Sequence, residues 1–435
     1  TLLAVARQME ADSSMNAIVK TQNSPRPLLP RLRFAEFRGA GGWDVKSLKT
    51  ACELNPPNAL LPENFVYIDL ESVEAGELKL RKIINKDEAP SRAQRLLRDG
   101  DVLFQMVRPY QRNNFHFKTD EEIAYVASTG YAQLRANESN DFLFHAVHTD
   151  DFVERVIAKC TGSNYPAINS SDLADIHLAV PSKAEQQKIA ACLTSLDTLI
   201  TAQTQKLDTL KTHKKGLMQQ LFPRAGETTP RLRFAEFRGE WESVPLGSLG
   251  KFFRGLTYGS NDVADGGLLV LRSSNIQGGR LILDSDLVFV AKQCPSDLRL
   301  RRGDVVICMS NGSKALVGKS AELDRDYSGE LTVGAFCSIF RPLIHFAKIA
   351  FDTQQYADFV SIGIAGGNIN NLKNSDLEAF EFHIPQEEAE QQKIAACLSS
   401  LDELITAQAQ KVTALQTHKK GLLQQLFPAQ AKASA

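Results

Sequence analysis

An internal repeat constrains this chain more than any other feature, because it fixes the number and order of its parts. The decapeptide PRLRFAEFRG at 30–39 returns unchanged at 230–239. A longer match joins 185–223 to 390–428, with 31 of 39 positions identical. Between these anchors the two halves diverge, so each half is a variable part followed by a nearly fixed tail. This pattern indicates one mechanical role shared by two different specificities.

Shorter landmarks extend the repeat into the variable parts. The segment LRDGDVL at 97–103 resembles LRRGDVV at 300–306, and Ser171–Leu173 resembles Ser375–Leu377. A chain of 435 residues also exceeds one ordinary hydrophobic core. We predict a mixed α/β (α+β) fold, with two domains in a pseudo-two-fold repeat joined by two long helices. The predicted segments are an N-terminal extension (1–29), a first domain (30–181), a first helix (182–223), a connector (224–229), a second domain (230–385), a second helix (386–428) and a C-terminal tail (429–435).

The fixed tails carry apolar residues at alternating spacings of four and three, with a glutamine filling one gap. A sustained repeat of this kind is typical of a coiled coil, and a polar seam residue commonly fixes its register. Each helix would be roughly 58 Å long at ~1.5 Å per residue. The predicted seam residues are Ile189, Leu193, Leu196, Ile200, Gln203, Leu207 and Leu210 in the first helix, and Ile394, Leu398, Leu401, Ile405, Gln408, Val412 and Leu415 in the second.

A narrow apolar stripe needs a partner, and the nearest partner is the twin helix. The short connector from Pro223 to Pro230 starts the second domain near the end of the first helix, which favours antiparallel pairing with the domains at opposite ends. The alternative is a helix that lies on its own domain. Ser182 and Glu185 have the spacing of a capping box, and the Phe-Pro pairs at 222–223 and 427–428 should end the helices.

Glycines 216 and 421 interrupt the last turns of the two predicted helices. Glycine inside a helix costs about 1 kcal/mol relative to alanine. Two interpretations stay open. Each glycine permits close approach of a partner backbone, or each marks a local break in its helix.

A net charge of −1 excludes a uniformly basic polymer-binding protein, but it leaves local basic faces open. Residues 79–118 hold ten basic against four acidic side chains, and residues 292–319 hold six against two. Lysine and arginine neutralise phosphates, and arginine, asparagine and glutamine match base edges. We therefore predict DNA contacts from Arg81, Lys82, Arg108, Tyr110, Arg112, Asn113, Asn114 and Lys118 in the first domain, and from Arg254, Tyr258, Arg272, Asn275, Asn311, Ser313, Lys314 and Lys319 in the second.

Two segments imitate catalytic motifs. Residues 312–320 (GSKALVGKS) resemble a phosphate-binding loop, but the glycines are six positions apart where the motif has five. Asn55-Pro-Pro-Asn58 is similar to the Asn-Pro-Pro-aromatic motif of DNA adenine methyltransferases, yet it lacks the aromatic residue and reads as a surface turn.

Other chemistry is not indicated. The sequence has no His-Glu-x-x-His, Cys-x-x-Cys or Gly-x-Ser-x-Gly, so we predict neither a metal site nor a catalytic residue. Seven scattered cysteines argue against a disulfide framework, and no apolar run is long enough for a membrane span. The start of the chain lacks the features of a secretory signal. We expect a cytoplasmic protein.

Two divergent parts, each with a Gly-Asp-Val strand start, a closing Ser-Asp-Leu…Pro stretch and a Glu-Gln-Gln-Lys-Ile-Ala helix, form an unusual combination. Over residues 30–428 it resembles the specificity subunit of type I restriction-modification systems, which act in host defence. The resemblance implies two target-recognition domains that each read half of a bipartite double-stranded DNA site. It implies helices that set the spacer and dock two methyltransferase (modification) subunits.

The resemblance also implies that this chain binds no cofactor. S-adenosylmethionine would sit on the adenine-methylating subunits, and ATP and Mg²⁺ on restriction subunits that translocate and cleave DNA. Two other functions compete. One is an interaction scaffold built on a coiled coil, which would lack a steep salt dependence of DNA affinity. The other is a nucleotide-binding enzyme, whose turnover should be lost in Lys319→Ala or Asn55→Ala.

Overall fold

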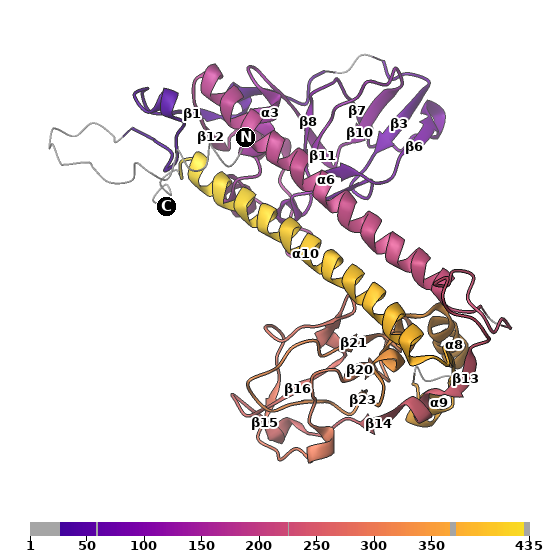
Figure 1. The fold of residues 1–435 in the computed structure, drawn as a ribbon. Helices are drawn as coiled ribbons and strands as arrows, with labels where there is room; N and C mark the ends of the chain where they lie inside the picture. Colours follow the sequence, from indigo (N-terminus) through magenta and orange to yellow (C-terminus); the bar gives the residue numbers. More distant parts are fainter. Residues whose placement is uncertain (1–26, 58–59, 225, 366–370, 430–435) are drawn as a thin grey trace. The chain divides into compact units, whose positions relative to one another are not determined.

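The computed structural model describes residues 27–57, 60–224, 226–365 and 371–429. Most of the predicted N-terminal extension, Asn58 of the Asn-Pro-Pro turn and nearly all of the C-terminal tail lie outside the described residues. The chain divides into two compact units. Unit 1 comprises residues 1–204 and 410–435, and unit 2 comprises residues 205–409. Each unit therefore contains one variable domain and a part of both long helices (Figure 1).

Unit 1 contains two four-stranded sheets, with strand orders β6-β3-β10-β7 and β2-β11-β8-β9, and a closing antiparallel pair, β1 with β12. Strands β10 and β3 run parallel. The strands are β1 (Asp44–Ser47), β2 (Cys52–Leu54), β3 (Asn64–Ile68), β4 (Val73–Glu74), β5 (Glu77–Leu78), β6 (Lys82–Asn85), β7 (Ala93–Leu96), β8 (Val102–Gln105), β9 (Phe115–His116), β10 (Ala124–Ser128), β11 (Tyr131–Ala136) and β12 (His177–Val180). The short helices are α2 (Leu48–Ala51), α3 (Asn140–Ala146), α4 (Asp150–Ala158) and α5 (Ser170–Ala174).

Unit 2 follows the same plan with a larger main sheet. Its six-stranded sheet has the order β14-β23-β20-β21-β18-β17 and its four-stranded sheet the order β15-β19-β16-β22, while β13 and β24 form the closing pair. The strands are β13 (Glu242–Pro245), β14 (Gly250–Arg254), β15 (Val263–Ala264), β16 (Leu268–Leu271), β17 (Ile276–Gln277), β18 (Arg280–Leu281), β19 (Phe289–Val290), β20 (Val305–Cys308), β21 (Ser320–Glu322), β22 (Leu331–Val333), β23 (Cys337–Pro342) and β24 (Glu381–Ile384). The short helices are α7 (Leu246–Leu249), α8 (Gln354–Ala365) and α9 (Asn374–Glu378). Two mixed α/β domains were predicted, and the structure confirms them.

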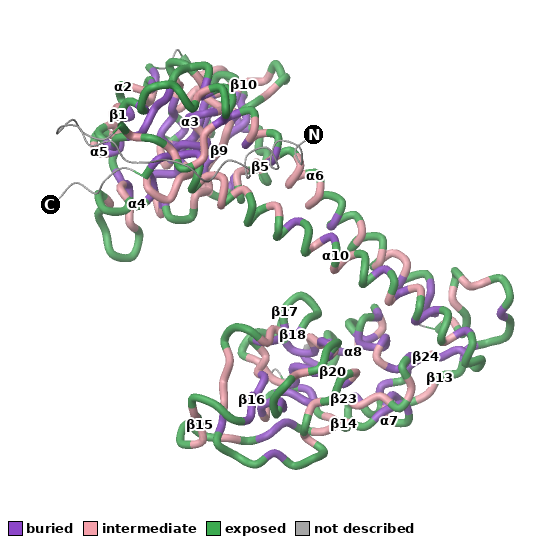
Figure 2. The backbone as a smooth tube through the Cα atoms, turned by 60° about the vertical axis from the view of Figure 1, so that its left-hand side comes forward, coloured by how far each residue is buried: buried purple, intermediate pink, exposed green. Residues whose placement is uncertain are grey.

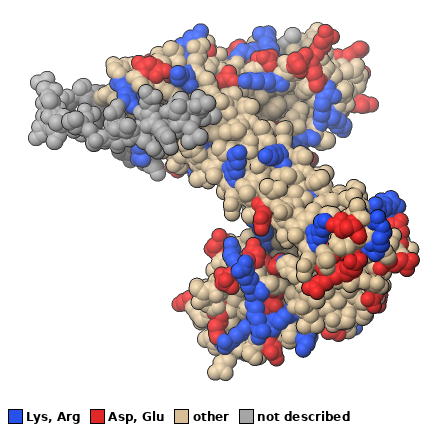
Figure 3. All heavy atoms as spheres, viewed as in Figure 1, with Lys and Arg blue, Asp and Glu red and all other residues tan. Residues whose placement is uncertain are grey.

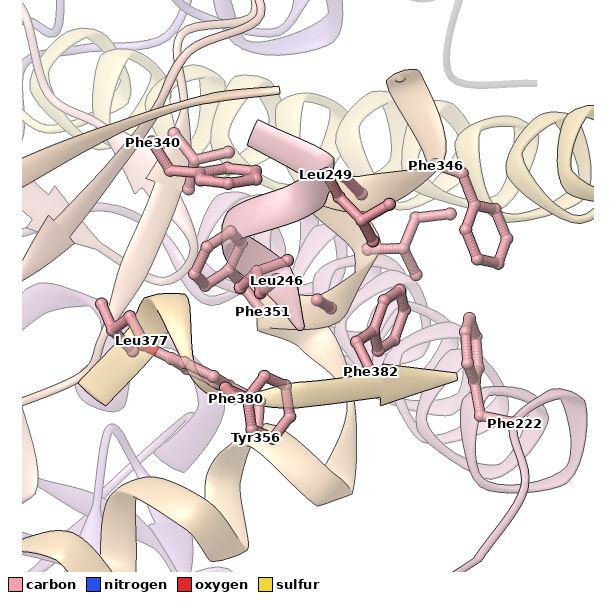
Figure 4. Packing of buried hydrophobic residues seen from close by; sticks show 14 of the residues in the cluster. Phe222, Leu246, Leu249, Phe340, Phe346, Phe351, Tyr356, Leu377, Phe380 and Phe382 are labelled. Atoms are coloured by element: carbon pink, nitrogen blue, oxygen red, sulfur yellow. The ribbon is translucent and has the colours of Figure 1, made fainter. Parts of the chain in front are cut away.

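Apolar side chains of the central strands form the core of each unit, so the strands are mostly buried and the connecting loops mostly exposed (Figure 2). In unit 2 an aromatic cluster joins the domain to the helix ends (Figure 4). There Phe222 meets Trp241 edge to face, with ring centroids 5.7 Å apart. In unit 1 Phe427 meets Trp43 in the same way at 5.9 Å. The residues at the predicted helix ends are thus core residues of the domains.

The long helices α6 (Lys183–Leu221) and α10 (Glu388–Leu426) each contain 39 residues. Both end directly before the Phe-Pro pairs, as predicted. The backbone N–H of Glu185 donates to the Ser182 hydroxyl at 3.4 Å, so half of the predicted capping box is present. The second hydrogen bond of a capping box, from the Ser182 N–H to the Glu185 carboxylate, was wrongly predicted, because this carboxylate accepts from Arg33 instead.

Neither open interpretation of the two helix glycines fits the structure. Both helices continue through Gly216 and Gly421 without a break. A Cβ atom added at either glycine would meet nothing within 4 Å among the described residues. Both glycines are partly exposed, and no neighbouring group among the described residues requires glycine at either position.

The Pro-Arg-Leu-Arg repeat attaches each domain to a helix start. In unit 1, Arg33 makes a two-pronged contact with Glu185, at 2.8 Å (Nε–Oε1) and 2.7 Å (Nη2–Oε2). In unit 2, Arg233 contacts Glu390 in the same way at 2.7 and 2.8 Å. Both glutamate side chains are almost fully buried. The carboxylate raises the pKa of each arginine through its hydrogen bond and charge. The arginine shared by both copies of the decapeptide thus makes the same contact with a buried glutamate in each unit.

Segments of the two helices also pack within each unit. In unit 1, Lys419 of α10 contacts Asp197 of α6 at 2.5 Å. In unit 2, Lys214 of α6 contacts Asp402 of α10 at 2.7 Å. These are the same two repeat positions, with the helices exchanged. None of the predicted seam residues is exposed. Leu404, outside the predicted seam, is 58% exposed.

Candidate DNA interface

The polar loop that follows β8 in unit 1 displays one aromatic side chain and lies beside a second, which belongs to the loop between α4 and α5. Arg108 precedes the short 3-10 turn Pro109–Gln111, and Tyr110 within that turn is half exposed. The Arg108 guanidinium lies 4.3 Å from the ring centre of Tyr165, itself 65% exposed. A planar cation stacked on an exposed ring is a surface suited to phosphates and base edges.

The same loop holds two residues in the left-handed region, Arg108 (φ 53°) and Arg112 (φ 55°). Such backbone strain costs of order 1–3 kcal/mol per residue and persists only where the surroundings enforce it. The Arg108 N–H donates to the Pro166 carbonyl at 2.7 Å. The Arg112 side chain donates to Asp150 at 2.6 Å and to the His148 carbonyl at 3.1 Å. The loop is thus held in a fixed shape.

Asn113 and Asn114 support this loop from below. Asn113 Oδ1 accepts from the Ala75 N–H at 3.2 Å. Asn114 is buried, its Oδ1 accepts from the Gln105 N–H at 2.8 Å, and its Nδ2 lies 3.3 Å from His148 Nε2. Burial lowers the pKa of His148 to about 4, so this imidazole is neutral near pH 7. Asn114 is not available to DNA in this conformation, so its predicted role as a direct contact is replaced by a structural one.

The segment 79–118 of unit 1 has fewer unpaired positive charges in the folded structure than its sequence suggests. Arg81 pairs with Glu121 at 2.6 Å, and Lys118 pairs with Asp141 at 2.7 Å. Both acids lie outside the segment whose charges were counted, so the sequence overstated the local positive charge. Lys82 is exposed on β6. On the face shown in Figure 3, acidic side chains are interspersed among the basic ones.

Unit 2 brings several predicted residues together around a groove of about 660 Å³. Tyr258, Arg272 and Asn311 line it, together with Phe336, which is 70% exposed. Arg272 donates to the Asp286 carboxylate at 2.5 Å. The hydrogen bond from the Ser274 hydroxyl and the positive charge of Arg272 both lower the pKa of Asp286. Asn311 donates to the Ser273 hydroxyl at 2.9 Å.

The other predicted residues of unit 2 lie near the groove or support it. Arg254 ends β14, exposed, and lines a neighbouring depression. Ser313 and Lys314 are exposed at the 3-10 turn Lys314–Leu316. Asn275 is buried and donates to the Asp286 carbonyl at 3.2 Å, so it too is a structural residue and not a direct contact in this conformation.

Lys319 donates to the Ile276 carbonyl at 2.8 Å. Strand β21 begins at the next residue, where a phosphate-binding loop requires the start of a helix. In the other near-match, Asn55 Oδ1 accepts from the Gln133 N–H at 3.0 Å, as a turn residue. Both segments therefore have structural roles in their loops.

The aspartate of each Gly-Asp-Val landmark forms the same ion pair in both units, at the start of the strand whose other end leads into the loop. Asp101 contacts Arg135 at 2.9 Å, and Asp304 contacts Arg341 at 2.7 Å. Both carboxylates are nearly inaccessible to solvent. The landmark thus marks a contact of the scaffold that both units share, whereas the loops at the other end of the strand differ.

Sequence reasoning missed the two most exposed aromatics of these loops, Tyr165 and Phe336. Tyr165 lies in the Gly-Ser-Asn-Tyr-Pro segment that ends at Pro166, and Phe336 follows Gly334 at the start of β23. The flanking glycines signalled turns. A turn does not reveal whether its aromatic side chain points to the core or to solvent.

Within the described residues, no group of three His, Cys, Asp or Glu side chains is arranged to hold a metal ion. In the same part of the chain, no helix has the length and apolar character needed to cross a membrane.

Comparison with known proteins identifies relatives over both halves of the chain. The family model described as "Type I restriction modification DNA specificity domain" matches residues 42–212 and 238–416. The chain is 36% identical over 174 residues to the StySPI specificity subunit of Salmonella potsdam, and 37% identical over 170 residues to the EcoKI specificity subunit of Escherichia coli K12. Each match covers 37% of this chain but only 36% of the relative's length.

A solved structure supports the fold. The type I restriction-modification S subunit from M. genitalium has a TM-score of 0.56 and 16% identity, over 93% of this chain and 100% of that chain. The family match covers the greater part of both variable domains and reaches into both long helices. The chain belongs to the family of type I restriction-modification DNA specificity domains.

Proposed function

We propose that this chain is a DNA-reading subunit of a type I restriction-modification complex, in which unit 1 and unit 2 each recognise one half of a bipartite double-stranded site. One observation carries the proposal. The same scaffold, with the same buried aspartate–arginine pair, presents different chemistry at the corresponding loop. In unit 1 the loop after β8 carries Arg108 and Tyr110, and Tyr165 of a separate loop lies against Arg108. In unit 2 the loop after β20 carries Asn311, which lines a groove together with Tyr258, Arg272 and Phe336 of other segments. Different side chains on equal scaffolds suit two different sequences.

We further propose that α6 and α10 form one antiparallel coiled coil that separates the two readers. The exchanged ion pairs, Lys419 with Asp197 and Lys214 with Asp402, support this arrangement. Two readers on one side of DNA would have half-site centres about one helical turn apart, ~34–36 Å. Half-sites of a few base pairs then leave a spacer of roughly 6–8 base pairs.

The partners follow from this role. Two methyltransferase subunits would dock on the helices, bring S-adenosylmethionine and methylate adenine, and restriction subunits would bring ATP and Mg²⁺. This chain would then have no catalytic residue and bind no cofactor. The complex would act in the cytoplasm.

DNA reading is tested by measuring the affinity of the purified chain, with its co-purifying methyltransferase, for double-stranded DNA across a range of salt concentrations. A DNA reader that neutralises phosphates should show a steep negative slope of log affinity against log salt. A flat slope would favour the interaction scaffold. Nucleotide turnover that is lost in Lys319→Ala would favour the enzyme.

The spacer role is tested by inserting seven residues into both helices, after Thr204 and after Ala409. Seven residues add about 10 Å of helix, or about three base pairs of spacer. We expect a longer spacer with both half-sites unchanged. Altered half-sites with an unchanged spacer would reject the proposed role of the helices.

A further inference from the structure

The groove of unit 2 has the size and lining of a ligand site. Its volume of about 660 Å³ lies within the range of roughly 300–1,000 Å³ that small-molecule sites occupy. Tyr258 and Phe336 supply aromatic rings, and Arg272, Ser273 and Asn311 supply polar groups. A lining of aromatic rings with a few polar groups can hold a planar ligand in one orientation.

A local exchange of side chains separates this groove from the corresponding place in unit 1. In unit 1, Leu70 lies against Gly130, where an added Cβ would be 3.1 Å from its side chain. The parallel strand pairs β3–β10 and β16–β22 align Ile68 with Ala127 and Leu271 with Val333. By this register, Ser273 corresponds to Leu70, and Phe336 corresponds to Gly130. A leucine that covers a glycine is thus replaced by a small hydroxyl beside an exposed phenyl ring.

The polar groups of the groove retain hydrogen-bonding capacity. Arg272 donates through Nη2 to Asp286, and its buried Nε contributes no group to the groove surface. Asn311 donates through Nδ2 to Ser273 and accepts through Oδ1 from the Ser313 N–H at 3.0 Å, which fixes the orientation of its amide. Guanidinium and amide groups are those that pair with the edges of bases.

The rim of the groove favours a nucleic acid over an uncharged ligand. Lys292 donates to the carbonyl of Thr257, a residue of the groove wall, at 2.8 Å, and its ammonium also lies 3.8 Å from the Asp262 carboxylate. Arg254 lies exposed beside Ala335, which lines both the groove and the neighbouring depression. Cations at the rim would hold the phosphates on either side of a base that enters the groove.

We propose that this groove receives one unstacked nucleobase of the half-site that unit 2 reads. Aromatic rings stack on a base, and the guanidinium and amide read its edge, as in other sites that take a base out of the duplex. The inference rests on the proposed function, because it requires unit 2 to bind DNA.

The test uses the full chain in complex with its methyltransferase, bound to DNA that carries the site found by modified-base sequencing. 2-Aminopurine replaces one base at a time in both half-sites, except at the methylated adenines, and its fluorescence reports unstacking. We expect a several-fold rise at one position of one half-site. In Phe336→Ala that rise should be lost, and the affinity should fall about tenfold. Phe336→Tyr, which keeps an aromatic ring, should retain the fluorescence rise and the affinity of the unsubstituted chain.

Leu343→Ala is the matched control, because Leu343 is a similarly exposed apolar residue of unit 2 that does not line the groove. It should leave fluorescence and affinity unchanged. Specific binding without any fluorescence rise, or a rise that persists in Phe336→Ala, would overturn the groove proposal and leave DNA reading intact. Binding without any sequence preference would instead overturn the proposed function.

Discussion

Unit 1 and unit 2 share their scaffold and differ in the loops that the scaffold carries. Both contain a parallel pair of strands, a closing antiparallel pair, a buried aspartate–arginine contact and an arginine–glutamate anchor to a long helix. In the variable loops, unit 1 presents a cation stacked on Tyr165, whereas unit 2 presents a groove beside Phe336. The comparison teaches that the repeated residues form the scaffold of each unit, whereas the variable residues form the exposed loops.

The largest expected effect comes from ending the chain at residue 223, which removes the variable domain of unit 2 and the whole of α10. In residues 1–223, the unit 1 core loses the Phe427 contact with Trp43, but a second copy of the fragment supplies the equivalent residue, Phe222, on a nearly identical helix. We expect the fragment to dimerise and to direct methylation at a palindromic site. Sedimentation and modified-base sequencing measure both. A strictly monomeric, inactive fragment would contradict antiparallel pairing of the helices.

Next in size is the loss of the scaffold ion pair. Asp101→Asn and Asp304→Asn remove a buried carboxylate from a partly exposed arginine, so each should cost less than the about 3–5 kcal/mol that is typical of a fully buried pair. Because the pair is common to both units, the two substitutions should lower the free energy of unfolding of their own unit by similar amounts. Hydrogen exchange followed separately in each unit measures this. A large loss in one unit only would show that the scaffolds are not equivalent.

Loop substitutions should separate the two specificities. Arg108→Ala should weaken recognition of one half-site, and Arg272→Ala recognition of the other, each by about 1–3 kcal/mol if the side chain contacts a base. Methylation rates on sites with single base changes would reveal which half-site each variant relaxes. If both variants relaxed recognition of the same half-site, the proposal that each unit reads a different half-site would be wrong.

The smallest expected effect is a difference in acid sensitivity. Burial lowers the pKa of both His145 and His148 in unit 1, that of His148 to about 4. As the pH decreases below about 6.5, the unfolded chain would bind protons at these histidines and the folded unit would not. The free energy of unfolding of unit 1 therefore decreases as the pH is lowered through this window. We expect unit 1 to lose about 1–2 kcal/mol between pH 7 and pH 5.

Unit 2 should lose less over the same range, because its exposed His345 and half-buried His383 are less shielded from solvent. Urea unfolding at both pH values, with hydrogen exchange to assign the unit, measures the difference. His148→Gln should reduce the pH dependence of unit 1. Equal acid sensitivity of the two units would show that these buried imidazoles do not control it.

Repetition made the fold largely predictable. The heptad spacing and the Phe-Pro pairs predicted both helices to within two residues at each end, and two mixed α/β domains followed from the repeat. The partner of Glu185 was not predictable, because Arg33 lies 152 positions away and no local pattern links them. Charge counting failed for a similar reason, since Arg81 is neutralised by Glu121, outside the counted segment.

The candidate site was only partly predictable. Residue type suggested that Asn114 and Asn275 contact DNA, yet an asparagine that supports a tight loop has the same local sequence as one that reads a base. Tyr165 and Phe336 were missed for the converse reason, because their exposure depends on tertiary packing.

Modified-base sequencing of the host genome, with and without this gene, tests the central claim most directly. If two scaffolds carry two different readers, deletion of the gene should abolish adenine methylation at one bipartite motif, made of two different short half-sites around a fixed gap. Arg108→Ala and Arg272→Ala in the restored gene should then each affect a different half of that motif. An unchanged methylome in a host whose methyltransferase partner is active and co-purifies with this chain would contradict the account.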